Sequence, residues 1–260
     1  MRDWPEVRQI TGGFTRVRRR LSERSTLDEF LRALNDNETF AATNWGPVEK
    51  VNLPFDPNEI AQILAKNGEC MIYRRKTPKW EVKLVSRKES SVKFRLATKT
   101  PPKHWPGFFE FMDEVASVLT PDFAGVSVGI QFGHPPNERD KKALDLYSGN
   151  GLDGRAYELY GVTGLCMRNY FGPAWVDQFG RERMLSLPIP VKELPWGGFR
   201  TDLTEEPWNA SLDELHSAWT RAMQHLRPTG VLAEWHPRNN AEYTIDFKKG
   251  PNSVIPTREK

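Results

Sequence analysis

Cysteine is scarce in this 260-residue sequence, and long apolar runs are absent. The two cysteines, Cys70 and Cys166, lie far apart, so both are predicted to be reduced thiols in the core and not parts of a disulfide framework. No uncharged apolar stretch approaches the roughly 18 residues that a membrane helix needs. The first residues lack the apolar segment of a secretory signal. We therefore expect a cytoplasmic protein without a membrane contact.

Motifs for metal, phosphate or nucleophilic chemistry are also missing. The five histidines form no H-x-x-x-H pair and there is no C-x-x-C, so no metal is expected. The run Gly149–Gly154 fits G-x-G-x-x-G, but without a buried strand before it and a long helix after it. A glycine loop is the better interpretation, and no cofactor is predicted. Neither a Walker loop nor a G-x-S-x-G elbow occurs, so we do not expect an enzyme.

What the chain does contain is a core-forming set of residues, with 38% hydrophobic residues, 11% aromatic residues and nine tryptophans. Helical spacing of apolar residues, with capping signals at Thr26 and Glu29 and at Ser211 and Glu214, predicts several helices. They cover residues 25–35, 56–67, 105–119, 173 onward and 211–226. Strand patterns cover residues 39–45, 69–74, 80–86, 91–98, 126–132, 164–171, 191–203 and 241–247. Residues 133–155 are predicted to be a loop.

Strands in groups, separated by helices, indicate an α+β fold with a largely antiparallel sheet and helices packed on one side. The segments Asn44–Pro47 and Asn169–Pro173 both end an aromatic strand in Gly-Pro. This echo raises the possibility of two similar sheet-and-helix halves. The predicted organisation is an arm over residues 1–25, one domain over 26–250 with possible sub-lobes 26–100 and 101–250, and a flexible tail over 251–260.

Positive charge is concentrated at the start of the chain. The net charge is +3, and residues 1–24 carry seven arginines against three acidic residues, which leaves the remaining body at −1. Nucleic-acid-binding domains usually carry a basic patch on the folded body. We interpret the segment as an amphipathic surface element docked by its apolar side. Contact with an acidic partner or RNA is the alternative.

The most unusual segment runs from Arg168 to Arg183 and is dense in aromatic residues. Pro173 fits the first position of a helix because its missing amide proton has no partner there. Tyr170 and Trp175 could fill the junction between sheet and helix. Exposed and flanked by arginines, they would instead form a protein-binding hot spot.

This segment, followed by Leu187-Pro188 and the run Trp196–Trp208, resembles immunity proteins of bacterial polymorphic toxin and type VI secretion systems. The earlier Asn44–Pro47 is similar to the W-G-P near the start of the immunity protein 52 family. The resemblance implies a non-enzymatic α+β protein that binds and blocks a cognate effector toxin, often a nuclease. It supplies no catalytic residue.

The hypothesis of an immunity protein needs a surface that meets the toxin, and inhibitors of nucleases commonly present acidic residues. We therefore predict a toxin-binding set of two aromatic and five acidic residues: Tyr170, Trp175, Asp202, Glu205, Glu206, Asp213 and Glu214. The mixed-charge run 138–145 is a second candidate. The expected partner is the toxin, with this chain a monomer or homodimer. Two alternatives remain, a nucleic-acid-associated protein that uses the arginine segment and a hydrolase assembled from distant residues such as His134 and Asp145.

Overall fold

The computed structural model describes residues 7–48, 52–86, 90–130, 138–148, 154–237 and 245–256. The first half of the chain forms β1 (Val7–Val17), α1 (Arg24–Asp36), β2 (Asn44–Gly46), β3 (Leu53–Pro54), α2 (Pro57–Asn67), β4 (Glu69–Arg74), β5 (Trp80–Val85), β6 (Ser91–Leu96) and α3 (Trp105–Leu119). The second half forms β7 (Pro121–Ile130), α4 (Glu138–Ser148), α5 (Gly154–Tyr160), β8 (Arg168–Phe171), α6 (Pro173–Phe179), α7 (Arg181–Leu185), β9 (Val191–Glu193), β10 (Phe199–Asp202), α8 (Leu212–Leu226), β11 (Glu234–Pro237) and β12 (Ile245–Lys248).

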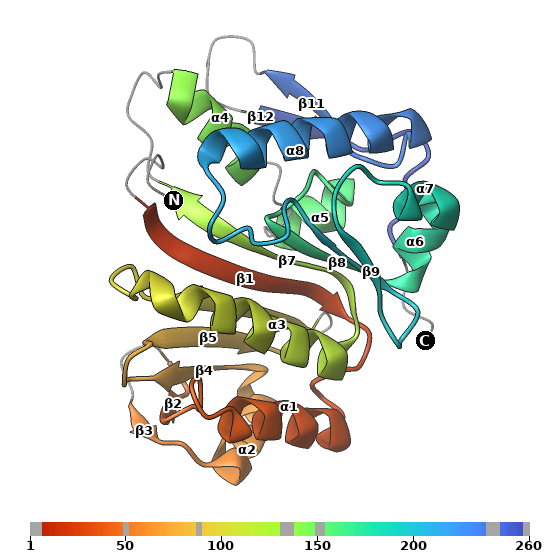
Figure 1. Ribbon diagram of the computed structural model, residues 1–260. Coiled ribbons are helices and arrows are strands. Elements are labelled where there is room, and N and C mark those ends of the chain that lie inside the picture. The colour runs from red at the N-terminus through yellow and green to blue at the C-terminus, as the bar shows by residue number, and fades with distance from the viewer. Residues whose placement is uncertain are drawn as a thin grey trace.

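Ten of these strands form one sheet, in the order β3-β2-β4-β5-β6-β1-β7-β8-β10-β9 (Figure 1). Every neighbouring pair in it is antiparallel. The predicted α+β fold with a largely antiparallel sheet is confirmed. The two halves are joined in this sheet through the pairing of β1 with β7. Their Gly-Pro motifs occupy different places, since β2 lies next to an edge strand and β8 lies next to β7.

The first strand, β1, corrects the expected N-terminal arm. It lies between β6 and β7, near the middle of the sheet, where Ile10, Phe14 and Val17 are buried. Gly12 faces α3 so closely that a Cβ atom there would lie 2.7 Å from the Sδ atom of Met112. Residues 7–17 are therefore part of the core sheet and not an arm docked on its surface.

Helices α1 and α3 pack side by side over the first half of the sheet (Figure 1). The ring of Phe111 on α3 stacks on Phe40 at 5.3 Å, and Trp80 donates a hydrogen bond from Nε1 to the carbonyl of Phe40. The residues between the apolar positions of β5 and β6 face water, as in the exposed ion pair of Arg95 with Glu81. Here the helices cover one side, as expected from the alternating pattern.

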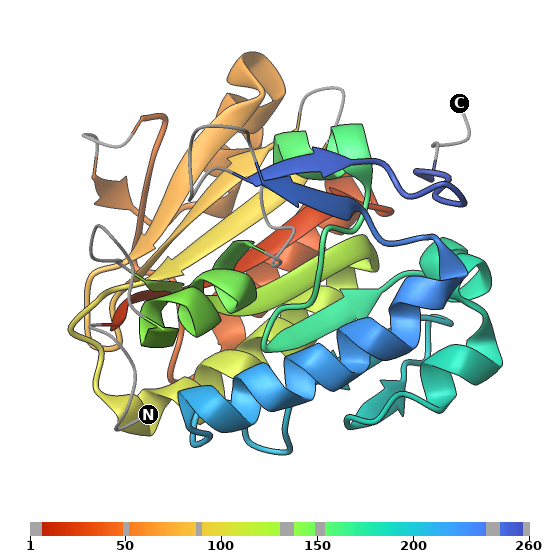
Figure 2. The ribbon, with the colours of Figure 1, turned by 90° about the horizontal axis from the view of Figure 1, so that it is seen from above.

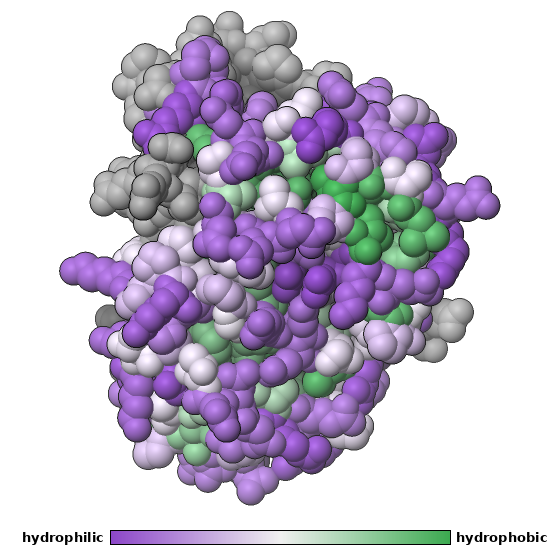
Figure 3. Space-filling model, viewed as in Figure 1, coloured by the Kyte–Doolittle hydropathy of each residue, from purple (hydrophilic) through white to green (hydrophobic). Residues whose placement is uncertain are grey.

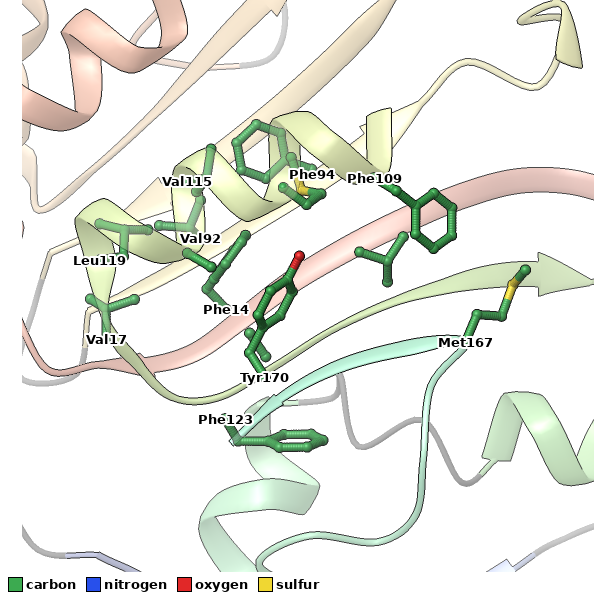
Figure 4. Packing of buried hydrophobic residues seen from close by; sticks show 14 of the residues in the cluster. Phe14, Val17, Val92, Phe94, Phe109, Val115, Leu119, Phe123, Met167 and Tyr170 are labelled. Atoms are coloured by element: carbon green, nitrogen blue, oxygen red, sulfur yellow. The ribbon is translucent and has the colours of Figure 1, made fainter. Parts of the chain in front are cut away.

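The second half of the sheet is covered on both faces. Successive residues of a strand point to opposite faces, and Figure 4 shows Phe123 across the sheet from Phe14 and Tyr170. Phe14 stacks with Tyr170 on the α3 side, at 6.2 Å. On the other face, Phe123 stacks with Tyr157 of α5 at 5.9 Å. Seen from above, α5 and the β11–β12 hairpin lie together (Figure 2), and the rings of Tyr160 and Phe247 join them.

Side-chain caps form at the starts of α2 and α8, and the capping box predicted at Ser211 and Glu214 is confirmed. Asp56 accepts hydrogen bonds from the first amides of α2, and Ser211 and Glu214 form a complete capping box on α8. The predicted box at Thr26 and Glu29 is wrong. Thr26 lies inside α1 and is buried, and the N-cap residue Glu23 makes no side-chain capping bond. A buried threonine in the first turn fits the packing of α1 against the core, which overrides the local capping pattern.

Other differences concern lengths and ends. The strand predicted over 39–45 is limited to β2, and the one predicted over 164–171 is limited to β8. The predicted loop over 133–155 contains α4 and the start of α5, and the glycine run 149–153 lies outside the described residues. The expected flexible tail is fixed as far as 256, where Ser253 is buried and Val254 exchanges two hydrogen bonds with Gln178.

Among the helices that the structure describes, none combines the length and the apolar character that crossing a bilayer requires.

Candidate protein-binding surface

The aromatic segment after β8 forms a tight junction between strand and helix. Gly172 donates its amide proton to the carbonyl of Asp122, and a Cβ atom at Gly172 would lie 2.8 Å from the Pro121 carbonyl oxygen. Only glycine fits this close approach. Trp175 then points into the core, where its Nε1 donates to the hydroxyl of Tyr157 at 2.7 Å.

Burial corrects three of the seven residues predicted to bind the toxin. Tyr170 and Trp175 have no exposed surface, and Asp202 is 3% exposed. The first two complete the aromatic core, and the third is held inside an ion network. The interpretation in which Tyr170 and Trp175 fill the junction between sheet and helix is confirmed, and the alternative of an exposed aromatic hot spot at this segment is wrong.

That ion network lies between α3 and the strands β8 and β10. Arg168 donates from Nε to Oδ1 of Asp202 at 2.6 Å and from Nη1 to Oδ2 of Asp113 at 3.1 Å. Arg200 donates from Nη1 to the same oxygen of Asp113 at 2.7 Å, and its Nε lies 3.0 Å from Asp202 without hydrogen-bond geometry. The hydroxyl of Tyr170 donates to Asp113. Two arginines thus face two carboxylates, and the network is neutral.

Burial dominates the electrostatics of this network. It raises the pKa of Tyr170 well above the usual 10, with the nearby Asp113 charge acting in the same direction. Burial also raises the pKa of Asp202 above 3.8, against the opposing effect of Arg168 and Arg200. For Arg168, burial lowers the pKa, but its neighbours more than offset this and the pKa is raised. The arginines are occupied by the carboxylates, so the network fastens α3 to the sheet and offers no free anion site.

The remaining four predicted residues are exposed, but three of them already have side-chain partners. Asp213 pairs with Lys142 of α4 at 2.6 Å, which lowers the pKa of this carboxyl group. Glu214 accepts hydrogen bonds from Ser211 in the capping box, and they lower its pKa as well. Glu205 and Glu206 precede α8 and are exposed, and Glu206 accepts a hydrogen bond from the Asn209 side chain at 2.7 Å. The acidic surface is therefore smaller than the sequence indicated.

The second candidate run, 138–145, lies on α4 against α8. Lys141 pairs with Glu138 at 2.6 Å, and Asp145 contacts His216 of α8 at 2.9 Å. A pocket of about 280 Å³ lies between the two helices beside Lys142 and Asp213. Charges of both signs alternate along this surface, so it carries little net charge.

An apolar patch lies on the face shown in Figure 3, over α7 and the segment that leads to β9. Leu185 is 52% exposed, and Val191 and Leu194 are partly exposed. The edge strand β9 is short and is preceded by Pro188 and Pro190, which discourages pairing with another strand. A partner is therefore better contacted by the side chains of this patch than by the backbone of strand β9.

Two histidine pairs bear on the alternative of a hydrolase. His216 contacts Asp145, and the hydroxyl of Ser186 lies 3.2 Å from Nε2 of His225. The two histidines are nine residues apart on α8, so the pairs do not combine into one triad. In the described chain, no carboxylate contacts His225, and His134 lies outside the described residues. Sequence reasoning missed both pairs because they join segments far apart in the chain.

Other reactive groups are sequestered. Burial raises the pKa of the Cys70 thiol to about 12 and that of Cys166 well above 9. The residues with described positions contain no cluster of three or more histidine, cysteine or carboxylate side chains that could hold a metal.

Comparison with known proteins finds a shared fold at low sequence identity. No protein-family model and no curated protein matches the sequence. A similar solved structure is the Pseudomonas aeruginosa type VI secretion system (T6SS) protein PA0821. The TM-score is 0.50 and the sequence identity is 12%, and the match covers 94% of this chain and 80% of the other. At this identity the likeness shows a shared fold, and membership of the immunity protein 52 family stays a prediction.

Proposed function

We propose that this chain is an immunity protein that binds an effector toxin of a T6SS in the cytoplasm and blocks it stoichiometrically. The observation that carries the proposal is the shared fold with a T6SS protein over nearly the whole chain. The immunity-like pattern of aromatic and Gly-Pro residues supports it independently. The chain acts as a monomer or homodimer in this proposal, and no cofactor is involved.

The surface also supports binding through side chains. Glu205 and Glu206 are exposed next to α8, and Leu185 is exposed on α7. Interfaces combine apolar anchors with a polar rim, and exposed charges steer association. A nuclease toxin would meet only a small acidic surface here, so its basic substrate groove is not a strong match for this face.

Co-expression with the product of the adjacent gene tests the proposal. We expect this chain to restore growth of cells that produce the toxin, and the two proteins to elute together from a sizing column. A toxic neighbour that is neither bound nor neutralised would refute the proposal. Growth rescue without a complex would favour an enzymatic antidote. Loss of that rescue in Ser186→Ala would then implicate the pair of Ser186 with His225.

A further inference from the structure

A groove of about 730 Å³ lies between the start of α1 and the end of α2, on the first half of the sheet. Buried aliphatic side chains, among them Leu21, Leu27 and Leu64, form its floor. Ala65 and Lys66 of α2 are exposed at its rim. The volume falls in the range of binding sites that enclose a small ligand or a few side chains. The groove is separate from the acidic residues before α8.

Among the described residues that line this groove, the two charged ones, Arg24 and Lys66, are basic. Lys66 makes no ion pair within the described structure, and Arg24 pairs with Asp28 at 2.9 Å. Beside the groove, the segment that leads into Leu21 exposes Arg18 and Arg20, which likewise have no ion-pair partner among the described residues.

The ends of the two helices leave this charge only partly compensated, because Lys66 lies in the last turn of α2, near the negative end of that helix dipole. Helix α1 has no acidic residue in its first turn, but the carboxylate of its N-cap residue Glu23 accepts a hydrogen bond from Thr26 and offsets part of the positive end of the helix dipole. At the end of α2, the Leu64 carbonyl is already satisfied by the Gly68 amide and the Ser86 hydroxyl. The groove therefore combines an aliphatic floor with a positive edge.

We infer that this groove docks an acidic segment of a protein partner that carries aliphatic side chains between its carboxylates. Basic residues at the rim match the carboxylates, and the floor accepts the aliphatic groups. A single-stranded RNA is a poorer match, because such sites stack bases on aromatic rings and none of the described residues that line this groove is aromatic. In this inference the basic residues beside the groove, Arg18 and Arg20, contribute to partner binding at a place separate from the acidic residues before α8.

The identification of the partner as the toxin rests on the proposed function. A toxin held through an acidic segment is bound outside a basic nucleic-acid groove. This arrangement agrees with the small acidic surface described above, since Asp213 is already paired with Lys142.

Peptide binding to the full chain tests the groove without knowledge of the toxin. The probe is a fluorescent 16-residue amphipathic peptide of leucine and glutamate, with a leucine–lysine twin and a 16-nucleotide RNA as comparisons. The groove variant combines Ala65→Glu with Lys66→Glu, two changes at exposed positions. Lys93→Glu on β6 is the control for the lysine reversal, because it reverses an exposed lysine outside the groove.

We expect the native chain and Lys93→Glu to bind the glutamate peptide saturably, and the groove variant to bind it about tenfold more weakly. Binding should weaken with added salt, and the lysine peptide should not bind. Thermal melts confirm that the variants are folded. The inference is overturned if the glutamate peptide does not bind, if both variants bind it equally, or if the groove variant loses RNA binding or self-association instead.

The toxin experiment separates this inference from the proposed function. If the native chain and the groove variant rescue growth and form the complex equally well, the groove inference fails and the immunity function stands. If the native chain binds the peptide but neither binds nor neutralises the toxin, the immunity function fails and the groove remains a site for another acidic protein.

Discussion

Removing the charge of Asp202 tests whether the buried ion network holds the second half of the sheet. The side chains of Asp202 and Arg168 are only 4% and 5% exposed, and their contact is 2.6 Å long. Removing one partner of a buried pair typically costs about 3–5 kcal/mol, because the other charge loses its partner. Arg168 keeps Asp113 and the Phe109 carbonyl, so we expect Asp202→Asn to cost about 3 kcal/mol, at the lower end.

Urea unfolding followed by tryptophan fluorescence measures this cost. With a denaturant slope of about 3 kcal/mol per molar, the midpoint should fall by about 1 M. Asp213→Asn is the matched control, because the Asp213–Lys142 contact has the same 2.6 Å length but an exposed carboxylate. Its midpoint should stay at the native value, since exposed ion pairs contribute little.

A double-mutant cycle completes the test of the network. Arg168→Met alone leaves Asp202 without its closest partner, so this single change should also be strongly destabilising. The double variant lacks both charges of the Arg168–Asp202 pair, so neither charge remains without its partner. Its loss of unfolding free energy should therefore be clearly smaller than the sum of the two single losses. Equal midpoints for Asp202→Asn and Asp213→Asn, or additive losses in the cycle, would refute the reasoning.

Three further predictions follow from the packing. A Cβ atom at Gly125 would lie 2.9 Å from the Cβ atom of Cys166. Gly125→Ala should therefore lower the free energy of unfolding by about 2 kcal/mol through overpacking, as measured by thermal unfolding. An unchanged melting temperature would contradict this prediction. Since burial raises the pKa of both Cys70 and Cys166, their protonated thiols should react with a disulfide reagent at about pH 8 only after unfolding. Rapid labelling of the native chain would count against this. Deleting residues 1–24 removes β1 from between two neighbours, and circular dichroism should then show an unfolded chain; a folded product would contradict the central position of β1.

Local patterns predicted much of the fold. The antiparallel run β4–β5–β6 and the helices α2, α3 and α8 follow from alternation, helical spacing and caps, all of which involve residues close in sequence. The central strand β1 was missed because its inward positions include Gly12. At that position Met112 of α3 fills the space that an apolar side chain of β1 would occupy, so the alternation is not visible in the sequence.

The candidate site was harder to predict because burial and pairing are tertiary properties. Asp202 and Glu205 look equivalent in the sequence, yet one is held by Arg168 and the other faces solvent. The pair of Asp145 with His216 joins residues 71 positions apart. The charge excess of the first 24 residues was visible, but the groove beside it exists only because α2 packs next to α1.

The position of β1 has a consequence for synthesis on the ribosome. Thr11 pairs with Ser127, a separation of 116 residues, so one side of β1 stays unpaired until β7 has emerged. At 5–20 residues per second, this delay is about 6 to 23 s. For that time the growing chain exposes an apolar strand edge that can pair with another nascent chain. Cotranslational yield should therefore depend on translation speed between β1 and β7 and on chaperones that shield the strand during that interval.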